Sequence, residues 1–317
     1  MRRREFIALL SGVAAWPFAA RAQQAKVPRI GVLLPAEREP FYTPFEEGLR
    51  RLGYIPGRTI EVDIRSAEGQ PSRLAPLAAE LVARNADILV AHQTPAVFAL
   101  RQASSTIPIV MSSGDPVGTG LIESLARPGG NITGVSSTTA ELSGKILELI
   151  REVKPATRRV ALLANAADPF TKPLTEQIQR GATQLGIEMR PIMVLRADEF
   201  EAAFAEMARW EADAVVVQPS LPRRRAIELA QQARLPAASM TKVFAAEGGL
   251  ITYAALITDG YRDLATYIDK VLKGTKPADL PVQQPTRFEL AVNLKTAKAI
   301  GVTIPPTILA RADEVIE

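Results

Sequence analysis

Short runs of β-branched and aliphatic residues alternate along the chain with longer stretches in which apolar residues recur every three or four positions. The first pattern is typical of strands buried in a parallel sheet, and the second is typical of amphipathic helices that cover such a sheet. Residues 29–34 (RIGVLL) and 87–91 (DILVA) are examples of the strand pattern. The alternation therefore predicts an α/β fold built on parallel sheets.

The pattern occurs twice. The first series predicts strands at 29–34, 59–64, 87–91, 108–111 and 131–135, with helices at 44–52, 74–84 and 95–103. The second series predicts strands at 159–164, 188–195 and 213–218, with helices at 173–185 and 197–210. The first helix of each series ends in a Leu-Gly pair, at Leu52-Gly53 and at Leu185-Gly186. We therefore expect two equivalent doubly wound lobes.

The last part of the chain is too short for a third core. It predicts a strand at 249–253, a helix at 259–272 with Asp259 as its N-cap, a strand at 287–293 and a short helix that ends at Ile300. These elements complete the two lobes if the chain crosses between them near 135–142, 253–257 and 281–286. We expect one lobe from residues 27–137 plus 256–285 and the other from 138–255 plus 286–317, joined by a multi-strand hinge.

The first 22 residues have the pattern of a secretory signal peptide. Three arginines precede an apolar stretch from Phe6 to Ala20, which ends in the small-x-small site Ala20-Arg21-Ala22. The apolar stretch has 15 residues and contains Gly12 and Pro17, so it is shorter than the ~20 residues of a transmembrane helix. The start RRREFI is similar to a twin-arginine signal, although the general secretory route stays open. We expect cleavage near Ala22 and a protein that works in the periplasm.

Composition and charge remove several classes of function. The chain of 317 residues carries a net charge of +4, but its first 22 residues hold four arginines and one glutamate, which leaves +1 after cleavage. The excess charge is therefore no argument for a nucleic-acid partner. The chain has no cysteine, which excludes disulfides, thiolate nucleophiles and cysteine-ligated metals. Its length fits about two domains.

Motifs for enzymatic chemistry are missing. The chain contains one histidine, His92, and no Gly-x-Ser-x-Gly, Gly-x-Gly-x-x-Gly or Walker sequence. We expect His92 to be a hydrogen-bonded residue near the edge of a lobe rather than a catalytic base. Most acidic residues fall on the solvent faces of expected helices. We therefore expect no cofactor, no metal ion and no catalytic residue.

Small polar residues gather just past the carboxyl ends of the expected strands. In open α/β sheets that edge is where ligands bind, and the amino ends of the following helices favour an anionic group. Helix capping uses the same residue types, so each residue taken alone supports capping as well as it supports binding. The segments are Pro35 to Phe41, His92 to Pro95, Ser112 to Pro116, Ser136 to Thr139, Asn165 to Phe170, Gln218 to Ser220, and Tyr253. All of them would open onto one cleft between the lobes.

Several of these segments resemble one family. The stretches GDPVGTGLIESLARPGGNITGVS (114–136), LLANAADP (162–169) and GGLITYA (248–254), together with the C-terminal segment from Lys273 to Glu317, are similar to bacterial ABC-transporter substrate-binding proteins of the tryptophan-binding type. That resemblance implies a type I periplasmic binding protein-like fold, closure around a ligand and docking on an ABC permease in the inner membrane. It also implies a ligand site at Thr94, Ser112, Asp115, Ser136, Asn165, Asp168, Ser220 and Tyr253. The loop from Pro35 to Pro40 departs from the Ser or Gly-Ser turn that family members have there.

The sequence thus favours an exported monomeric protein that captures a small molecule between two lobes and delivers it to an ABC importer. The helix amino ends favour a carboxylate, and Phe41, Phe170 and Tyr253 could stack on an aromatic body. An amino acid or an aromatic carboxylate is the expected ligand. Two alternatives stay open, namely an exported α/β hydrolase that uses Asp115 or Asp168 with a bound cation, and a protein that presents its ligand to a sensory receptor.

Overall fold

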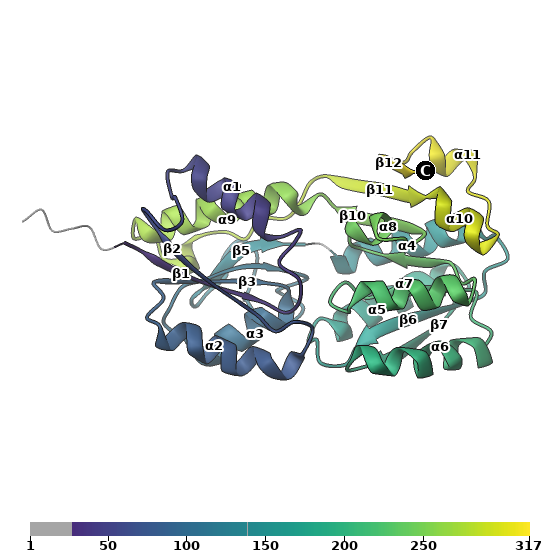
Figure 1. The fold of residues 1–317 in the computed structure, drawn as a ribbon, viewed down its shortest axis with the longest axis horizontal. Helices are drawn as coiled ribbons and strands as arrows, with labels where there is room; N and C mark the ends of the chain where they lie inside the picture. The colour runs from purple at the N-terminus through teal and green to yellow at the C-terminus, as the bar shows by residue number, and fades with distance from the viewer. Residues whose placement is uncertain (1–26, 138) are drawn as a thin grey trace, which may run out of the picture.

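The computed structural model describes residues 27–137 and 139–317, and these form two α/β lobes side by side (Figure 1). The predicted signal peptide lies outside the described residues. Lobe 1 contains a parallel sheet with the strand order β2-β1-β3-β4-β5, and lobe 2 contains a sheet with the order β12-β11-β10-β9-β8-β6-β7. The predicted fold class is therefore confirmed.

Helices cover both faces of the sheet of lobe 1. Its strands are β1 (Arg29–Leu34), β2 (Glu61–Ser66), β3 (Ile88–His92), β4 (Ile109–Ser113) and β5 (Ile132–Ser136), and its helices are α1 (Tyr42–Arg51), α2 (Leu74–Ala83), α3 (Thr94–Ala103) and α9 (Ile257–Leu272). Helices α1 and α9 lie on one face and α2 and α3 on the other (Figure 1). The strands read as continuous apolar runs because both of their faces are buried.

Lobe 2 follows the same plan with a longer sheet. Its strands are β6 (Arg159–Asn165), β7 (Glu188–Val194), β8 (Ala214–Val217), β9 (Ala237–Ser239), β10 (Ile251–Ala255), β11 (Phe288–Asn293) and β12 (Glu314–Ile316). Its helices are α4 (Thr139–Val153), α5 (Thr171–Gln184), α6 (Phe200–Arg209), α7 (Arg223–Gln232), α8 (Val243–Ala246), α10 (Leu294–Ile300) and α11 (Pro306–Leu309). The sequence predicts parallel strands throughout this sheet, but one pair, β10 and β11, is antiparallel. The reason is that β10 runs toward lobe 1, whereas β11 enters the sheet from lobe 1 and runs away from it.

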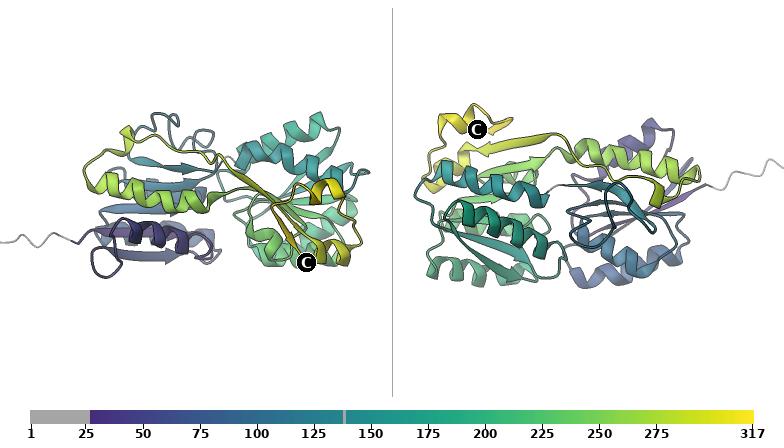
Figure 2. Two further views of the ribbon diagram at one scale, coloured as in Figure 1. Left: turned by 90° about the horizontal axis from the view of Figure 1, so that it is seen from above. Right: turned by 180° about the vertical axis from the view of Figure 1, so that it is seen from behind.

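The described chain passes between the lobes at three places (Figure 2). It leaves lobe 1 after β5, returns from β10 to α9, and leaves again before β11. Helix α9 packs on α1 with Tyr261, Leu264 and Ile268 in the core of lobe 1. The helix begins at Ile257 after Leu256, which places Asp259 in its first turn. The expectation that Asp259 is the N-cap is therefore wrong, because helical backbone starts two residues earlier.

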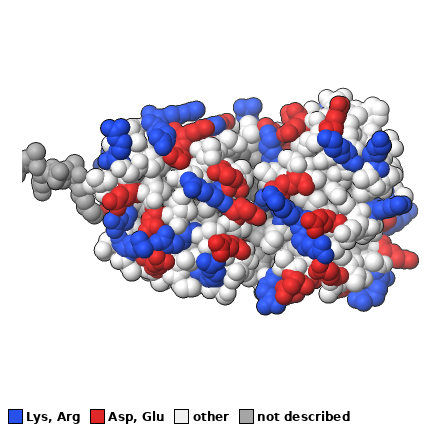
Figure 3. All heavy atoms as spheres, in the orientation of Figure 1, with Lys and Arg blue, Asp and Glu red and all other residues white. Residues whose placement is uncertain are grey.

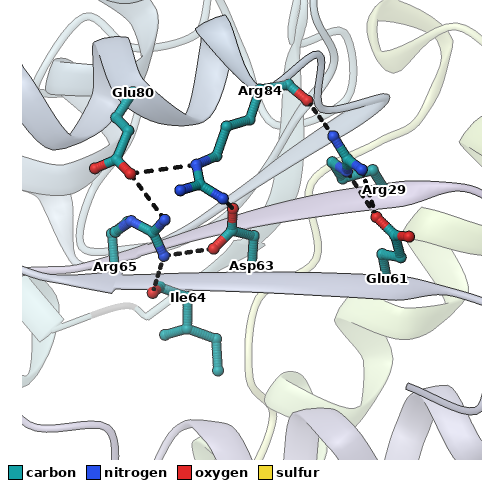
Figure 4. Close-up of polar contacts among 7 residues, drawn as sticks. All are labelled: Arg29, Glu61, Asp63, Ile64, Arg65, Glu80 and Arg84. Carbon is teal, nitrogen blue, oxygen red and sulfur yellow. Dashed lines mark hydrogen bonds and ion pairs between the residues drawn. The ribbon is translucent and has the colours of Figure 1, made fainter. Parts of the chain in front are cut away.

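Charged side chains cover the edge strand β2 of lobe 1 (Figure 4). Arg65 binds Asp63 on the same strand, and its Nη2 donates to Glu80 Oε1 of α2 at 2.8 Å. Arg84 Nη1 lies 3.2 Å from Asp63 Oδ2 and completes the network. Exposed ion pairs contribute only about 0–1 kcal/mol each. Their clearer effect is to place charges along an open sheet edge, which opposes pairing with another strand.

Positive and negative side chains are interspersed over the face of the molecule seen in Figure 3, with no stripe of a single sign on that face. Among the described residues, no helix is both long and apolar enough to span a bilayer.

Candidate functional site

A cavity among the described residues lies between the two lobes. Lobe 1 contributes the loop after β1, the ends of β3 and β4, and the start of α9, while lobe 2 contributes the loops after β6, β8 and β9. Its volume is about 140 Å³. Because a bound water needs roughly 10–15 Å³, this space holds a molecule of about ten to fourteen non-hydrogen atoms.

Four of the eight predicted site residues line this cavity. Thr94 and Ser112 come from lobe 1, and Asp168 and Ser220 from lobe 2. Each follows or ends a central strand of its sheet, where the carboxyl ends of parallel strands meet. The structure thus brings together residues that are up to 126 positions apart in the sequence, from Thr94 to Ser220.

The other four predicted residues do not line it. Asp115 Oδ1 accepts a hydrogen bond from the Gly118 N–H at 2.8 Å and so holds a turn. Ser136 is buried at the end of β5, and Asn165 lines only a smaller neighbouring cavity. Tyr253 packs on the core of lobe 2 and stacks on Phe288 at 6.0 Å between ring centroids.

Asp168 is the most unusual group in the cavity. Only 5% of the residue is exposed. Its Oδ1 accepts from the Phe170 N–H at 2.9 Å, and its Oδ2 accepts from Gln218 Nε2 at 2.9 Å. No ion pair among the described residues includes Asp168, and burial raises the pKa of its carboxyl, an effect that hydrogen bonds from Ser220, Phe170 and Gln218 oppose. The carboxyl group is therefore buried without a cation of its own among the described residues.

A buried network fixes the position of that carboxylate. Gln218 is fully buried, and its Oε1 accepts from the Asn165 N–H and from Thr171 Oγ1, both at 2.9 Å. With Oε1 occupied in this way, the side chain can only present its Nε2 to Asp168. Asn165, the last residue of β6, thus acts behind the cavity wall through its backbone N–H and does not line the cavity between the lobes.

On the side of lobe 1, the cavity meets the amino end of α3. Gln93 precedes this helix with a φ of 67°, a left-handed conformation that is uncommon for a residue with a side chain. Pro95 has no N–H, so the Thr94 and Ala96 N–H groups are the ones that the first turn of this helix leaves without a partner within it and available to an anion. Thr94 Oγ1 lies 2.9 Å from Ser113 Oγ, which orients the hydroxyl at this end.

Aromatic rings form another part of the wall. His92 and Tyr261 line the cavity, and His92 stacks on Phe41 at 4.9 Å and meets Tyr261 edge to face at 5.3 Å between centroids. Burial, together with the positive charge of Arg223, lowers the pKa of His92 to about 3, so the ring is neutral at neutral pH. Its Nδ1 has no hydrogen-bond partner among the described residues. The expectation of a hydrogen-bonded His92 is therefore wrong for this nitrogen.

Phe41, expected to stack on a ligand, is fully buried behind His92 and does not line the cavity, whereas Phe170 does line it. Three further residues line the cavity and are not among those predicted from the sequence, namely Arg223, Lys242 and Tyr261. Lys242 Nζ is 2.7 Å from Glu289 Oε2. Arg223 could have been predicted from the sequence, because it begins a helix three residues after Ser220, in the loop that follows a strand.

Among the described residues, no group of three or more His, Asp or Glu side chains could hold a metal ion.

The family model for ABC transporter substrate binding proteins matches residues 34–316. The chain belongs to this family of substrate-binding proteins. A tyrosine-binding protein of Clostridioides difficile (strain R20291) is 26% identical over 269 residues, which are 81% of this chain and 75% of that protein.

Solved structures agree with this family. The crystal structure of a conserved domain protein from Vibrio cholerae has a TM-score of 0.86 and 27% identity over 92% of this chain and 100% of that one. An ABC domain from Streptococcus pneumoniae in complex with L-Trp has a TM-score of 0.85 and 28% identity over 91% of this chain and 99% of that one.

Proposed function

We propose that this substrate-binding protein captures an α-amino acid with an aromatic side chain between its two lobes and delivers it to the permease of an ABC importer. The observation that carries the proposal is the buried Asp168 carboxylate, which has no cationic partner among the described residues. A ligand ammonium group would supply the missing positive charge. The α-carboxylate would bind at the amino end of α3, near Thr94 and Ser112, where free N–H groups and hydroxyls meet.

The walls and the relatives support an aromatic side chain. Phe170, Tyr261 and His92 present rings to the cavity, and its volume of about 140 Å³ suits a molecule of the size of an aromatic amino acid. The relatives named above are a tyrosine-binding protein and a domain in complex with L-Trp. The predicted signal peptide supports a site of action outside the cytoplasm, and the family supports a role in binding rather than catalysis.

Ligand binding is tested by titration calorimetry of the purified chain without residues 1–22, against the twenty amino acids. We expect at least one aromatic amino acid to bind in a 1:1 ratio, and ligand at 100 times its Kd to stabilise the fold by about 2.7 kcal/mol. If all twenty fail to bind at millimolar concentration, the proposed ligand class is wrong. Loss of uptake of the bound amino acid in a deletion strain, restored by the wild-type gene, would support delivery to an importer over a purely sensory role.

A further inference from the structure

Arg223 presents one free edge of its guanidinium group to the cavity. The side chain is 11% exposed. Its Nε and Nη2 both donate to the Glu247 carboxylate at 3.0 Å, an arrangement that fixes the plane of the group. Its Nη1 takes part in no hydrogen bond among the described residues. Glu37 Oε2 is 3.9 Å from Nη1, which is beyond hydrogen-bond distance.

The gap between Arg223 and Glu37 crosses the cleft. Glu37 belongs to the loop after β1 in lobe 1, Arg223 begins α7 in lobe 2, and both line the cavity. An oxygen atom can lie about 2.8 Å from both Nη1 and Oε2, since 3.9 Å is less than twice that distance. A ligand atom in this position would contact both lobes at once.

This polar gap and Asp168 face different strands of lobe 1. Arg223 faces Glu37, in the loop after β1. Phe170, whose N–H donates to Asp168, has its ring 3.1 Å from the position of a Cβ at Gly114, just after β4. Strand β3 lies between β1 and β4 in the sheet. A ligand whose ammonium group binds Asp168 would therefore extend its side chain toward Arg223.

Resting on the proposed function, we propose that Arg223 and Glu37 form a specificity site for a hydroxyl group at the end of the ligand's side chain, so that a phenol is preferred. A hydroxyl group can accept from Nη1 and donate to the Glu37 carboxylate. An indole N–H can only donate, which leaves Nη1 without a partner. A phenyl ring offers neither group and would desolvate both charges without compensation.

Calorimetric titration with L-tyrosine, L-tryptophan and L-phenylalanine tests this site. For the wild type we expect tyrosine to bind most tightly, with an affinity about 10- to 100-fold above that of phenylalanine. In Arg223→Met, the affinity for tyrosine should fall by a similar factor while that for phenylalanine changes less than about threefold. The matched control is Arg225→Met, two positions further along α7, where the side chain pairs with Glu201 and Glu228 on the surface. This control should keep the wild-type preference.

The outcomes separate the two proposals. If none of the three amino acids binds the wild type, the proposed function fails. If they bind but phenylalanine binds as tightly as tyrosine, the hydroxyl site is overturned and the proposed function stands. Should Arg223→Met fail to fold, as judged by circular dichroism, Glu37→Gln carries the test, because the Glu37 side chain is 57% exposed and its loss should not disturb folding. We expect this variant to bind tyrosine roughly 3- to 10-fold more weakly, and an unchanged ratio of tyrosine to phenylalanine affinity would refute the site.

Discussion

Replacing Asp168 by asparagine removes the buried negative charge and keeps the size of the side chain. The aspartate accepts from the Phe170 N–H at one oxygen and from Gln218 Nε2 at the other, and the asparagine has an NH2 group at one of these two positions, so one donor loses its acceptor. The lost hydrogen bond costs about 1 kcal/mol, whereas removal of an unpaired buried charge is favourable. We therefore expect the free energy of unfolding without ligand to change by less than about 1 kcal/mol.

Ligand binding should change far more than stability. Breaking a buried ion pair costs about 3–5 kcal/mol, and the asparagine oxygen can still accept one hydrogen bond from the ammonium group. We expect a loss of about 2–4 kcal/mol in binding, which is roughly 30- to 1000-fold in Kd. The control is Asp115→Asn, because Asp115 holds a turn and does not line the cavity. Its Kd should stay within about threefold of the wild type.

The assay that isolates this contact is a double-mutant cycle between protein and ligand. Calorimetry compares the bound amino acid with its analogue that lacks the amino group, on the wild type and on Asp168→Asn. Removing the amino group should weaken binding to the wild type by the same 2–4 kcal/mol and should have little further effect on the variant. If the two losses are simply additive, the ammonium group does not bind Asp168 and the orientation proposed for the ligand is refuted.

Two further predictions concern closure and pH. A Cβ at Gly114 of lobe 1 would lie 3.1 Å from Phe170 Cζ of lobe 2. We therefore expect Gly114→Val to hold the lobes apart, to weaken binding about tenfold, and to reduce the compaction that small-angle scattering detects on ligand addition. The control is Gly144→Ala, which should have none of these effects because nothing lies within 4 Å of a Cβ at that position. Full compaction of the valine variant would contradict this. The pKa of His92 is about 3 in the fold and 6.5 in the unfolded chain, so the unfolded chain takes up a proton at a higher pH than the folded one. The free energy of unfolding therefore falls as the pH drops below 6.5, by about 1.4 kcal/mol per pH unit. Denaturant titrations should show that the free energy of unfolding falls between pH 7 and pH 5 by about 2 kcal/mol less in His92→Gln than in the wild type. An equal fall in both proteins would refute the burial argument.

The sequence predicts the lobes well because their strands are buried on both faces and read as continuous apolar runs. It misses α4, although Leu142, Ile146, Leu149, Ile150 and Val153 recur at helical spacing and all are buried. The antiparallel pair of β10 and β11 could not be read from local pattern, since strand direction depends on which lobe the chain comes from.

The candidate site is predicted only where it depends on local position. Thr94, Ser112, Asp168 and Ser220 line the cavity because each lies at the carboxyl end of a central strand. Tyr261 could not be found in this way, because it comes from α9, whose return to lobe 1 is a long-range property of the fold.

In the proposed complex, both lobes contribute contacts to the ligand, and this division would couple affinity to closure. Asp168 and Arg223 belong to lobe 2, whereas α3 and Glu37 belong to lobe 1. In an open form, a ligand can contact the residues of only one lobe. The contacts that it gains with the second lobe therefore make it bind the closed form more tightly than the open form. Shifting a closed population from 1% to 99% requires about 5.5 kcal/mol of such preference. Two charge-assisted hydrogen bonds at about 1.5–3 kcal/mol each reach this range only when both form. We therefore expect a cavity with its charges split across the cleft to close on a ligand that carries both partners, and to stay open around one that lacks either.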